Sequence, residues 1–159
     1  MRLLNKKFAL IIFIYFLIYG LLAHAHSEHK TLFNEHCDLH FSSGIALNNV
    51  PVARSNEEQA QGLSNRNNAG VGMLFMWDVA APRTFWMHET RMPLIVAFFD
   101  AKGNLFASTP MLPNTETLHS SIAPAKYALE LAPDDFKKNH LLLGEKLMTL
   151  KCYSNARNK

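Results

Sequence analysis

Side chains capable of acid–base chemistry lie within an apolar block that runs from Gly72 to Asp100. His88 and Glu89 are adjacent in this block, which makes them an acid–base pair by residue type. Neighbouring residues of a strand point to opposite faces, so these two side chains are poorly placed to act together. The chain has no G-x-S-x-G turn, and neither cysteine lies in a motif that marks a nucleophile. The catalytic residues, if any, are therefore unknown from the sequence, and an envelope enzyme of unknown reaction stays an alternative function.

A binding surface is the better-supported interpretation of the same block. Strand alternation places Phe85 and Met87 on one face and Trp86 and His88 on the other. A tryptophan and a histidine beside a proline-bearing turn suit a ligand cleft, because pockets combine apolar walls with few polar groups. The alternative is that Trp86 is simply core. The predicted binding residues are Arg66, Trp86, His88, Thr90, Pro93 and Glu130.

Arginines flank the apolar block on both sides. Arg66 and Arg83 are each able to bind a carboxylate. We expect structural ion pairs within the chain, with Asp78 or Glu58 as partners, rather than ligand binding. Exposed pairs of that kind contribute little to stability.

Histidines near the start of the chain raise an alternative metal site. His26 and His29 are candidate copper ligands, which would make the chain a copper-binding accessory protein. A solvated arm explains the same residues, and core methionines that fill gaps explain the methionines of the apolar block. No zinc motif such as H-E-x-x-H is present. We expect no cofactor, with copper as the alternative.

The N-terminal residues predict export. Arg2, Lys6 and Lys7 precede an uncharged apolar run, and Ala23-His24-Ala25 follows as a small-residue cleavage pattern. This is the architecture of a secretory signal peptide, which we assign to residues 1–25. The apolar run is short of the roughly 20 residues that span a bilayer as a helix, so a membrane anchor is the alternative only if the segment stays uncleaved. We predict a secreted protein, most simply one of the bacterial periplasm.

Removing the signal changes the charge of the chain. The full sequence has 16 basic and 13 acidic residues, and the predicted signal carries three of the basic ones and no acidic one. The mature chain is therefore formally neutral. A nucleic-acid surface needs a basic face, so we exclude nucleic acid as a partner. The remaining partners are a small ligand or an envelope protein.

The two cysteines, Cys37 and Cys152, lie near the ends of the mature chain. In an oxidising compartment an even pair predicts a disulfide. Two free thiols or a redox pair are the alternatives, although redox pairs usually sit close in sequence.

Short apolar runs separated by turn residues predict a mainly β, α+β fold, specifically a compact antiparallel β-barrel-like domain with two short helices. Residues 26–36 are expected to form a flexible arm, 37–153 a single domain, and 154–159 a tail. The helices are expected after Ser55, ending at Gly62, and from Pro133. The expected strands cover residues 37–41, 45–47, 50–53, 73–77, 85–87, 94–99, 105–108, 126–131 and 146–152, with a break at Asn48-Asn49.

From about Val50 to Leu150 the chain resembles the domain of unknown function 192 family. The residues that carry the resemblance are Glu57 to Leu63, Arg66, Gly72 to Phe75, Phe85 to Met87, Thr90, Pro93-Leu94, Phe99-Asp100 and Tyr127 to Leu131. The resemblance implies a compact, largely β domain, often secreted or periplasmic, with no settled activity. The chain departs from the family pattern at His88, Glu89 and Ile95, where relatives usually carry lysine, asparagine and aspartate. The sequence thus favours an uncharacterised secreted module that binds a ligand or a partner.

Overall fold

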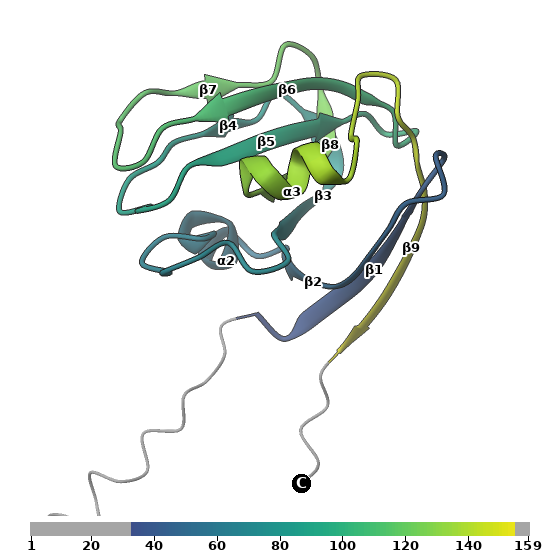
Figure 1. Ribbon diagram of the computed structural model, residues 1–159, viewed down its shortest axis with the longest axis horizontal. Coiled ribbons are helices and arrows are strands. Elements are labelled where there is room, and N and C mark those ends of the chain that lie inside the picture. The colour runs from purple at the N-terminus through teal and green to yellow at the C-terminus, as the bar shows by residue number, and fades with distance from the viewer. Residues whose placement is uncertain (1–32, 155–159) are drawn as a thin grey trace, which may run out of the picture. The chain divides into compact units, whose positions relative to one another are not determined.

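A seven-stranded sheet is the framework of the computed structural model, which describes residues 33–154 (Figure 1). The predicted signal peptide, His26 and His29 in the predicted arm, and all but the first residue of the predicted tail lie outside the described residues. Within the described part of the chain, no helix is long and apolar enough to cross a membrane.

The strands of the large sheet follow the order β6-β5-β8-β3-β2-β1-β9. Neighbouring strands are antiparallel except for β2 and β3, which are parallel and joined through a helix. The elements are β1 (Glu35–Phe41), β2 (Ala46–Ala53), α2 (Asn56–Gln61), β3 (Met73–Ala81), β4 (Thr84–Phe85), β5 (Leu94–Phe99), β6 (Leu105–Met111), β7 (His119–Ser120), β8 (Ala125–Leu131), α3 (Pro133–Lys138) and β9 (Leu147–Ser154). Strands β4 and β7 form a separate two-stranded sheet.

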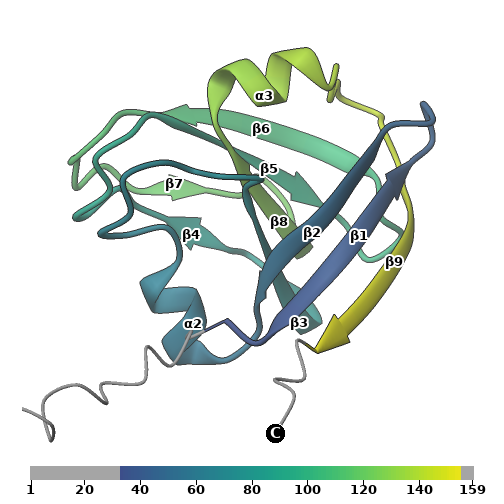
Figure 2. The same cartoon turned by 60° about the horizontal axis from the view of Figure 1, so that its bottom comes forward.

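The mainly β, α+β class with two short helices is confirmed, but the sheet is not closed into a barrel. Strands β6 and β9 are its two edges. They approach each other only where they begin, through an isolated bridge between Asn104 and Lys146. Figure 2 shows β1, β2 and β9 on one side of the sheet and β5, β6 and β8 on the other, with β3 between them.

Both faces of the sheet are buried, because alternate residues of the central strands enter two different cores. Phe75 and Phe98 belong to one core, and Leu74 and Phe99, their immediate neighbours, belong to the other. Such strands appear as continuous apolar runs in the sequence rather than as alternating ones. Methionines of the apolar block, including Met73 and Met87, are fully buried core residues.

Helix α2 begins and ends where the sequence predicts. The Ser55 hydroxyl accepts from the Glu58 backbone N–H (3.1 Å), and the Glu58 carboxylate accepts from the Ser55 N–H (2.9 Å). This reciprocal capping box fixes the first turn. Gly62 ends the helix at a φ of 46°, a conformation that favours glycine. Helix α2 therefore fixes the point at which the following loop begins.

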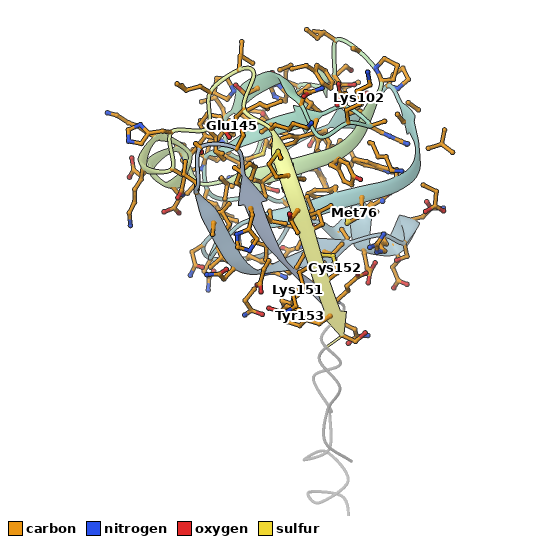
Figure 3. All side chains as sticks on the ribbon, turned by 90° about the vertical axis from the view of Figure 1, so that its right-hand side faces the viewer. Met76, Lys102, Glu145, Lys151, Cys152 and Tyr153 are labelled. Carbon is orange, nitrogen blue, oxygen red and sulfur yellow. A yellow bond between two sulfur atoms is a disulfide. The ribbon has the colours of Figure 1, made fainter. Side chains whose placement is uncertain are left out.

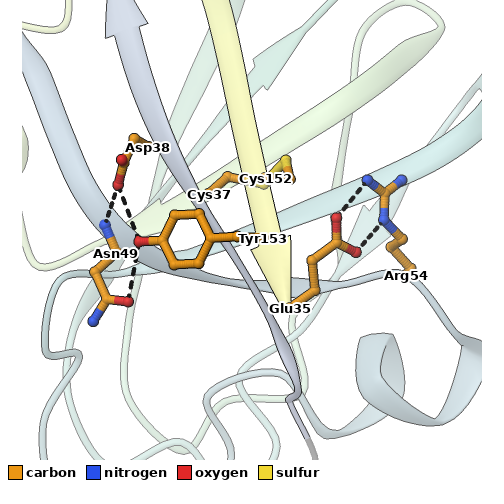
Figure 4. The surroundings of a disulfide bond; sticks show 7 residues. All are labelled: Glu35, Cys37, Asp38, Asn49, Arg54, Cys152 and Tyr153. Atoms are coloured by element: carbon orange, nitrogen blue, oxygen red, sulfur yellow. Dashed lines mark hydrogen bonds and ion pairs between the residues drawn. A yellow bond between two sulfur atoms is a disulfide. The ribbon is translucent and has the colours of Figure 1, made fainter. Parts of the chain in front are cut away.

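A Cys37–Cys152 disulfide joins β1 to β9, as predicted. The two cysteines are direct cross-strand partners (Figure 4), and Figure 3 shows Cys152 on the edge strand β9. The strands around them carry further polar bonds: Arg54 donates to Glu35 (2.9 Å), and the Tyr153 hydroxyl donates to Asp38 (3.2 Å). The edge strand β9 is thus tied covalently to the strand beside it.

Candidate ligand-binding cleft

A cleft of about 480 Å³ opens between α2 with its following loop, strand β3 and the segment around β4. Its size is within the range of small-molecule sites. The lining residues are Gln59, Ala60, Gln61, Gly62, Leu63, Ser64, Phe75, Trp77, Pro82, Arg83, Thr84, Phe85, Trp86, Thr90 and Glu130. Aromatic side chains and a small set of polar groups therefore share one concave surface.

Three aromatic rings form a fixed wall of the cleft. Phe75 and Phe85 pack edge to face with centroids 4.9 Å apart, and Trp77 stacks near Phe75 at 6.3 Å. The Trp77 indole N–H donates to the Gln59 side-chain oxygen at 2.8 Å, which locks the ring in place. The Gln59 amide nitrogen in turn donates to the Met76 carbonyl oxygen at 2.9 Å. The wall is thus held from α2 as well as from β3.

Trp86 is the exposed part of the aromatic surface. Half of it, 50%, is solvent-accessible, whereas Phe85 and Met87 on either side are buried. The alternation predicted for residues 85–88 is therefore present, although strand β4 covers only Thr84–Phe85. The Trp86 ring stacks on the His88 ring with centroids 5.0 Å apart. Trp86 is consequently a rim residue of the cleft and not a core residue.

His88 connects this rim to the following loop. Its Nδ1 lies 2.8 Å from the Glu116 carboxylate, and this hydrogen bond raises the pKa of His88 above its ordinary value of 6.5. Glu89 is next along the turn with a φ of 52°, and the Asn65 side chain donates to its carboxylate at 2.7 Å. His88 and Glu89 are each bonded to a different loop, but they lie in a turn and not in a strand, and His88 Nε2 is 4.0 Å from the Glu89 carboxylate, so the expectation that they point to opposite faces is wrong.

Two hydroxyls beside the cleft share a single acceptor. The Ser64 hydroxyl donates to the His88 carbonyl oxygen at 3.0 Å, and the Thr90 hydroxyl donates to the same oxygen at 3.2 Å. The Gln61 amide nitrogen donates to the Ser64 carbonyl oxygen at 2.9 Å. The loop after α2 and the 86–90 turn are therefore joined by side-chain bonds at the cleft.

Glu130 is the buried carboxyl of the site. It is only 4% exposed, on β8 between Met73 of β3 and Val96 of β5. Burial raises its pKa to about 8, and within residues 33–154 no hydrogen bond or charge offsets that effect. The side chain is therefore an uncharged carboxylic acid at neutral pH, able to donate one proton and to accept.

The expected ion pairs of Arg66 and Arg83 are absent from residues 33–154, where the pairs are Arg54–Glu35, His88–Glu116 and a longer His88–Glu89 contact. The guanidinium of Arg83 lies over the Trp77 ring, 4.3 Å from its centroid, and donates to the Val79 carbonyl oxygen at 2.6 Å. That of Arg66 lies 5.1 Å from the Phe33 ring centroid. Both are desolvated by packing on aromatic rings, which lowers their pKa. Glu58, one of the two carboxylates expected as partners, is bonded in the α2 capping box instead.

The structure brings together three of the six predicted binding residues. Trp86, Thr90 and Glu130 line the cleft, and His88 stacks on Trp86 without lining it. Arg66 and the exposed Pro93 are not among the lining residues.

Eight polar or aromatic lining residues were not among the predicted binding residues: Gln59, Gln61, Ser64, Phe75, Trp77, Arg83, Thr84 and Phe85. The two glutamines fall within the Glu57 to Leu63 motif that carries the family resemblance, which is the signal that points to them. For Trp77, the signal is its place in the apolar block.

The family is established by a match of residues 40–149 to the DUF192 family model, described as an uncharacterized ACR. The chain belongs to this family. It is similar in structure to a protein of unknown function from Novosphingobium aromaticivorans DSM 12444, with 24% identity and a TM-score of 0.62 over 73% of this chain and 83% of that chain. It is also similar to a proposed transcription regulator from Sinorhizobium meliloti 1021, with 26% identity and a TM-score of 0.65 over 76% of this chain and 95% of that one. Among curated proteins, none matches the chain significantly.

Proposed function

We propose that this protein is a secreted or periplasmic module that binds a small ligand in the cleft between α2 and the 82–90 segment. The observation that carries the proposal is the buried Glu130 carboxyl, which faces the cleft without a protein partner in the described chain. An unpaired buried polar group costs stability and is retained where a ligand completes its hydrogen bonds.

The shape of the site supports a small ligand over a protein partner. The aromatic wall of Phe75, Trp77 and Phe85 is rigid, and the polar groups converge within one concave volume. Ligand sites combine apolar walls with a few placed polar groups, whereas protein interfaces are flatter and larger. Trp86 at the rim then covers part of the ligand.

The proposed location rests on the disulfide and on the N-terminal sequence. A structural disulfide between Cys37 and Cys152 is typical of oxidising compartments. The export signal predicted for residues 1–25 leads to the same compartment. N-terminal sequencing of the protein recovered from the producing cell should start at His26, and an intact Met1 would contradict cleavage of the signal.

The binding proposal is tested by thermal unfolding in the presence of a compound panel that contains amines, amino acids, carboxylates and monosaccharides. At least one class should raise the Tm of wild-type protein, because binding to the folded state stabilises it. The shift should disappear in Trp86→Ala and persist in Met148→Ala, an exposed apolar residue on β9 that does not line the cleft. A panel in which no compound gives a Trp86-dependent shift contradicts the proposal.

A second candidate is an envelope enzyme that uses Glu130 as a general acid. A carboxyl whose pKa is raised to about 8 in a cleft is a feature of catalytic acids. Glu58 is engaged in the α2 capping box, and His88 is bonded to Glu116. Hydrolase substrates screened against wild type and Glu130→Gln test this alternative: an activity that survives the substitution unchanged would remove it.

A further inference from the structure

The polar side chains at the base of the cleft already donate most of their protons to protein acceptors. Ser64 and Thr90 both donate to the His88 carbonyl oxygen, which can only accept. The Gln61 amide nitrogen donates to Ser64, and the Gln59 nitrogen donates to main-chain carbonyl oxygens. What these groups still offer a ligand are mainly acceptor lone pairs, on two hydroxyl oxygens and on the Gln61 side-chain oxygen, with the second Gln61 N–H as a remaining donor.

Glu130 adds two more acceptor atoms once it loses its proton. The side chains opposite it on the neighbouring strands, Met73 and Val96, are apolar and offer it no donor. The cleft base is therefore rich in acceptors and contains one group that is able to become an anion. Such a base requires a ligand that brings several N–H donors and a positive charge.

The other ionisable residue of the lining is Arg83, and it lies toward the far end of β8. Its Nε is 3.5 Å from the carbonyl oxygen of Ala125, five residues before Glu130. Five residues of strand correspond to about 16 Å. A cation at Glu130 is thus kept away from the Arg83 charge, which is further spread over the Trp77 ring.

From this donor and acceptor arrangement, and resting on the proposed function, we propose that the cleft base binds the primary ammonium group of an amine ligand, with Glu130 as its counter-ion. A primary ammonium has three N–H donors, which match Glu130, Thr90 and Ser64 as acceptors. The Phe75 and Phe85 rings of the wall favour a cation further, because ring faces attract positive charge, whereas the Trp77 ring already carries Arg83.

Binding should then release a proton. The neutral carboxyl of Glu130 and an alkylammonium ion combine to give a carboxylate–ammonium pair, and the carboxyl proton passes to solvent. Since the pKa of Glu130 is raised to about 8 in the unliganded cleft, nearly one proton per bound amine should appear at pH 6.5. The apparent affinity should rise by up to about tenfold per pH unit from pH 6 to 7.5.

The test is a titration of the protein with n-butylammonium chloride in a pH-stat at pH 6.5, with n-butanol as the uncharged probe of similar shape. We expect saturable proton release with butylammonium and none with butanol. The release should be lost in Glu130→Gln and retained in Glu57→Gln, an exposed acid on α2 outside the cleft lining. Thr90→Val, which removes one acceptor while leaving Glu130 in place, should weaken binding at least about fivefold with proton release unchanged at saturation.

Three outcomes would overturn the ammonium proposal: no binding of butylammonium, binding without proton release, or proton release that Glu130→Gln retains. Equal binding of butanol and butylammonium would also overturn it. If butanol or another panel compound still binds in a Trp86-dependent manner, only the ligand class is wrong. If nothing in the panel binds there, the proposed function fails as well.

Discussion

Gly72 packs directly against the main chain of Glu130. At its φ of 88°, a Cβ would overlap the Glu130 carbonyl oxygen and lie 2.5 Å from the Leu131 side chain. The loop that leads into β3 therefore lies as close to β8 as a glycine allows. This contact fixes the strand that carries Glu130 into the cleft.

Gly72→Ala should be destabilising for two reasons, the left-handed backbone and the overlap with β8. The overlap adds about 1–3 kcal/mol to the conformational cost of about 1–2 kcal/mol. Gly144→Ala is the matched control, because Gly144 has the same φ of 88° with nothing within 4 Å of its Cβ position. Urea denaturation of both variants should separate the cost of the overlap with β8 from the cost of the left-handed backbone. Equal losses in the free energy of unfolding would show that the contact with β8 is not constraining.

The buried Glu130 should make the stability of the ligand-free protein depend on pH. Its folded-state pKa of about 8 lies above the ordinary value of 4.5, so the folded state holds a proton that the unfolded chain has released. Between these two values stability falls as pH rises, with this group contributing a slope of up to about 1.4 kcal/mol per pH unit. Below pH 4.5 and above pH 8 the contribution is constant.

Urea denaturation of wild type and Glu130→Gln between pH 5 and 8 measures this dependence as a difference. The free energy of unfolding of the variant should increase relative to that of wild type as pH rises, because an amide does not titrate. A pH-independent difference between the two proteins would mean that Glu130 is ionised in the fold.

The Cys37–Cys152 bond should contribute substantially to stability, because it closes a loop with a sequence separation of 115. For loops of that length the chain-entropy model gives about 4–5 kcal/mol, and measured losses are commonly about 2–5 kcal/mol. Denaturation with and without dithiothreitol, alongside the Cys37→Ala/Cys152→Ala double variant, provides the comparison. Less than about 1 kcal/mol of loss in both would show that the paired strands β1 and β9 hold without the bond.

The bond between His88 and Glu116 should be visible in the titration of the imidazole. We expect an NMR pKa for His88 above 6.5 in wild type, and a return toward 6.5 in Glu116→Gln, because the carboxylate favours the protonated ring. The raised pKa means that this pair stabilises the fold at pH values below 6.5 and loses its contribution as pH rises through the folded-state value. An unchanged titration in the variant would mean that the two side chains do not interact in solution.

Local features of this chain were predictable from sequence where short-range physics decides them. The α2 cap at Ser55, its end at Gly62 and the hairpin between β5 and β6 follow from residue types within a few positions. The disulfide followed from a count of two cysteines and an export signal. The family resemblance, carried by motifs spread over the chain, was confirmed over residues 40–149.

Long-range pairing was not predictable in the same way. Nothing local indicates that β2 runs parallel to β3, or that the sheet stays open between β6 and β9. Alternation in β8 points the Glu130 side chain to the face of the sheet opposite to that of Leu129 and Leu131. In a sheet with one solvent-exposed face, this pattern would predict that Glu130 is exposed. Because both faces are buried here, the same pattern yields a buried carboxyl. The place of Arg83 in the cleft lining was also not predicted. Its charge suggested a carboxylate partner, whereas its partner in the fold is the ring of Trp77, which is a long-range contact.

The proposed function depends on an uncharged Glu130 carboxyl at the base of the cleft. Its most direct test is the pH titration of the Glu130 side-chain carbon by NMR in the protein without and with saturating n-butylammonium. We expect a pKa of about 8 in the ligand-free protein and a fall of at least about 2.5 units when the amine is bound, which the release of nearly one proton at pH 6.5 requires. A pKa near 4.5 in the ligand-free protein would contradict it.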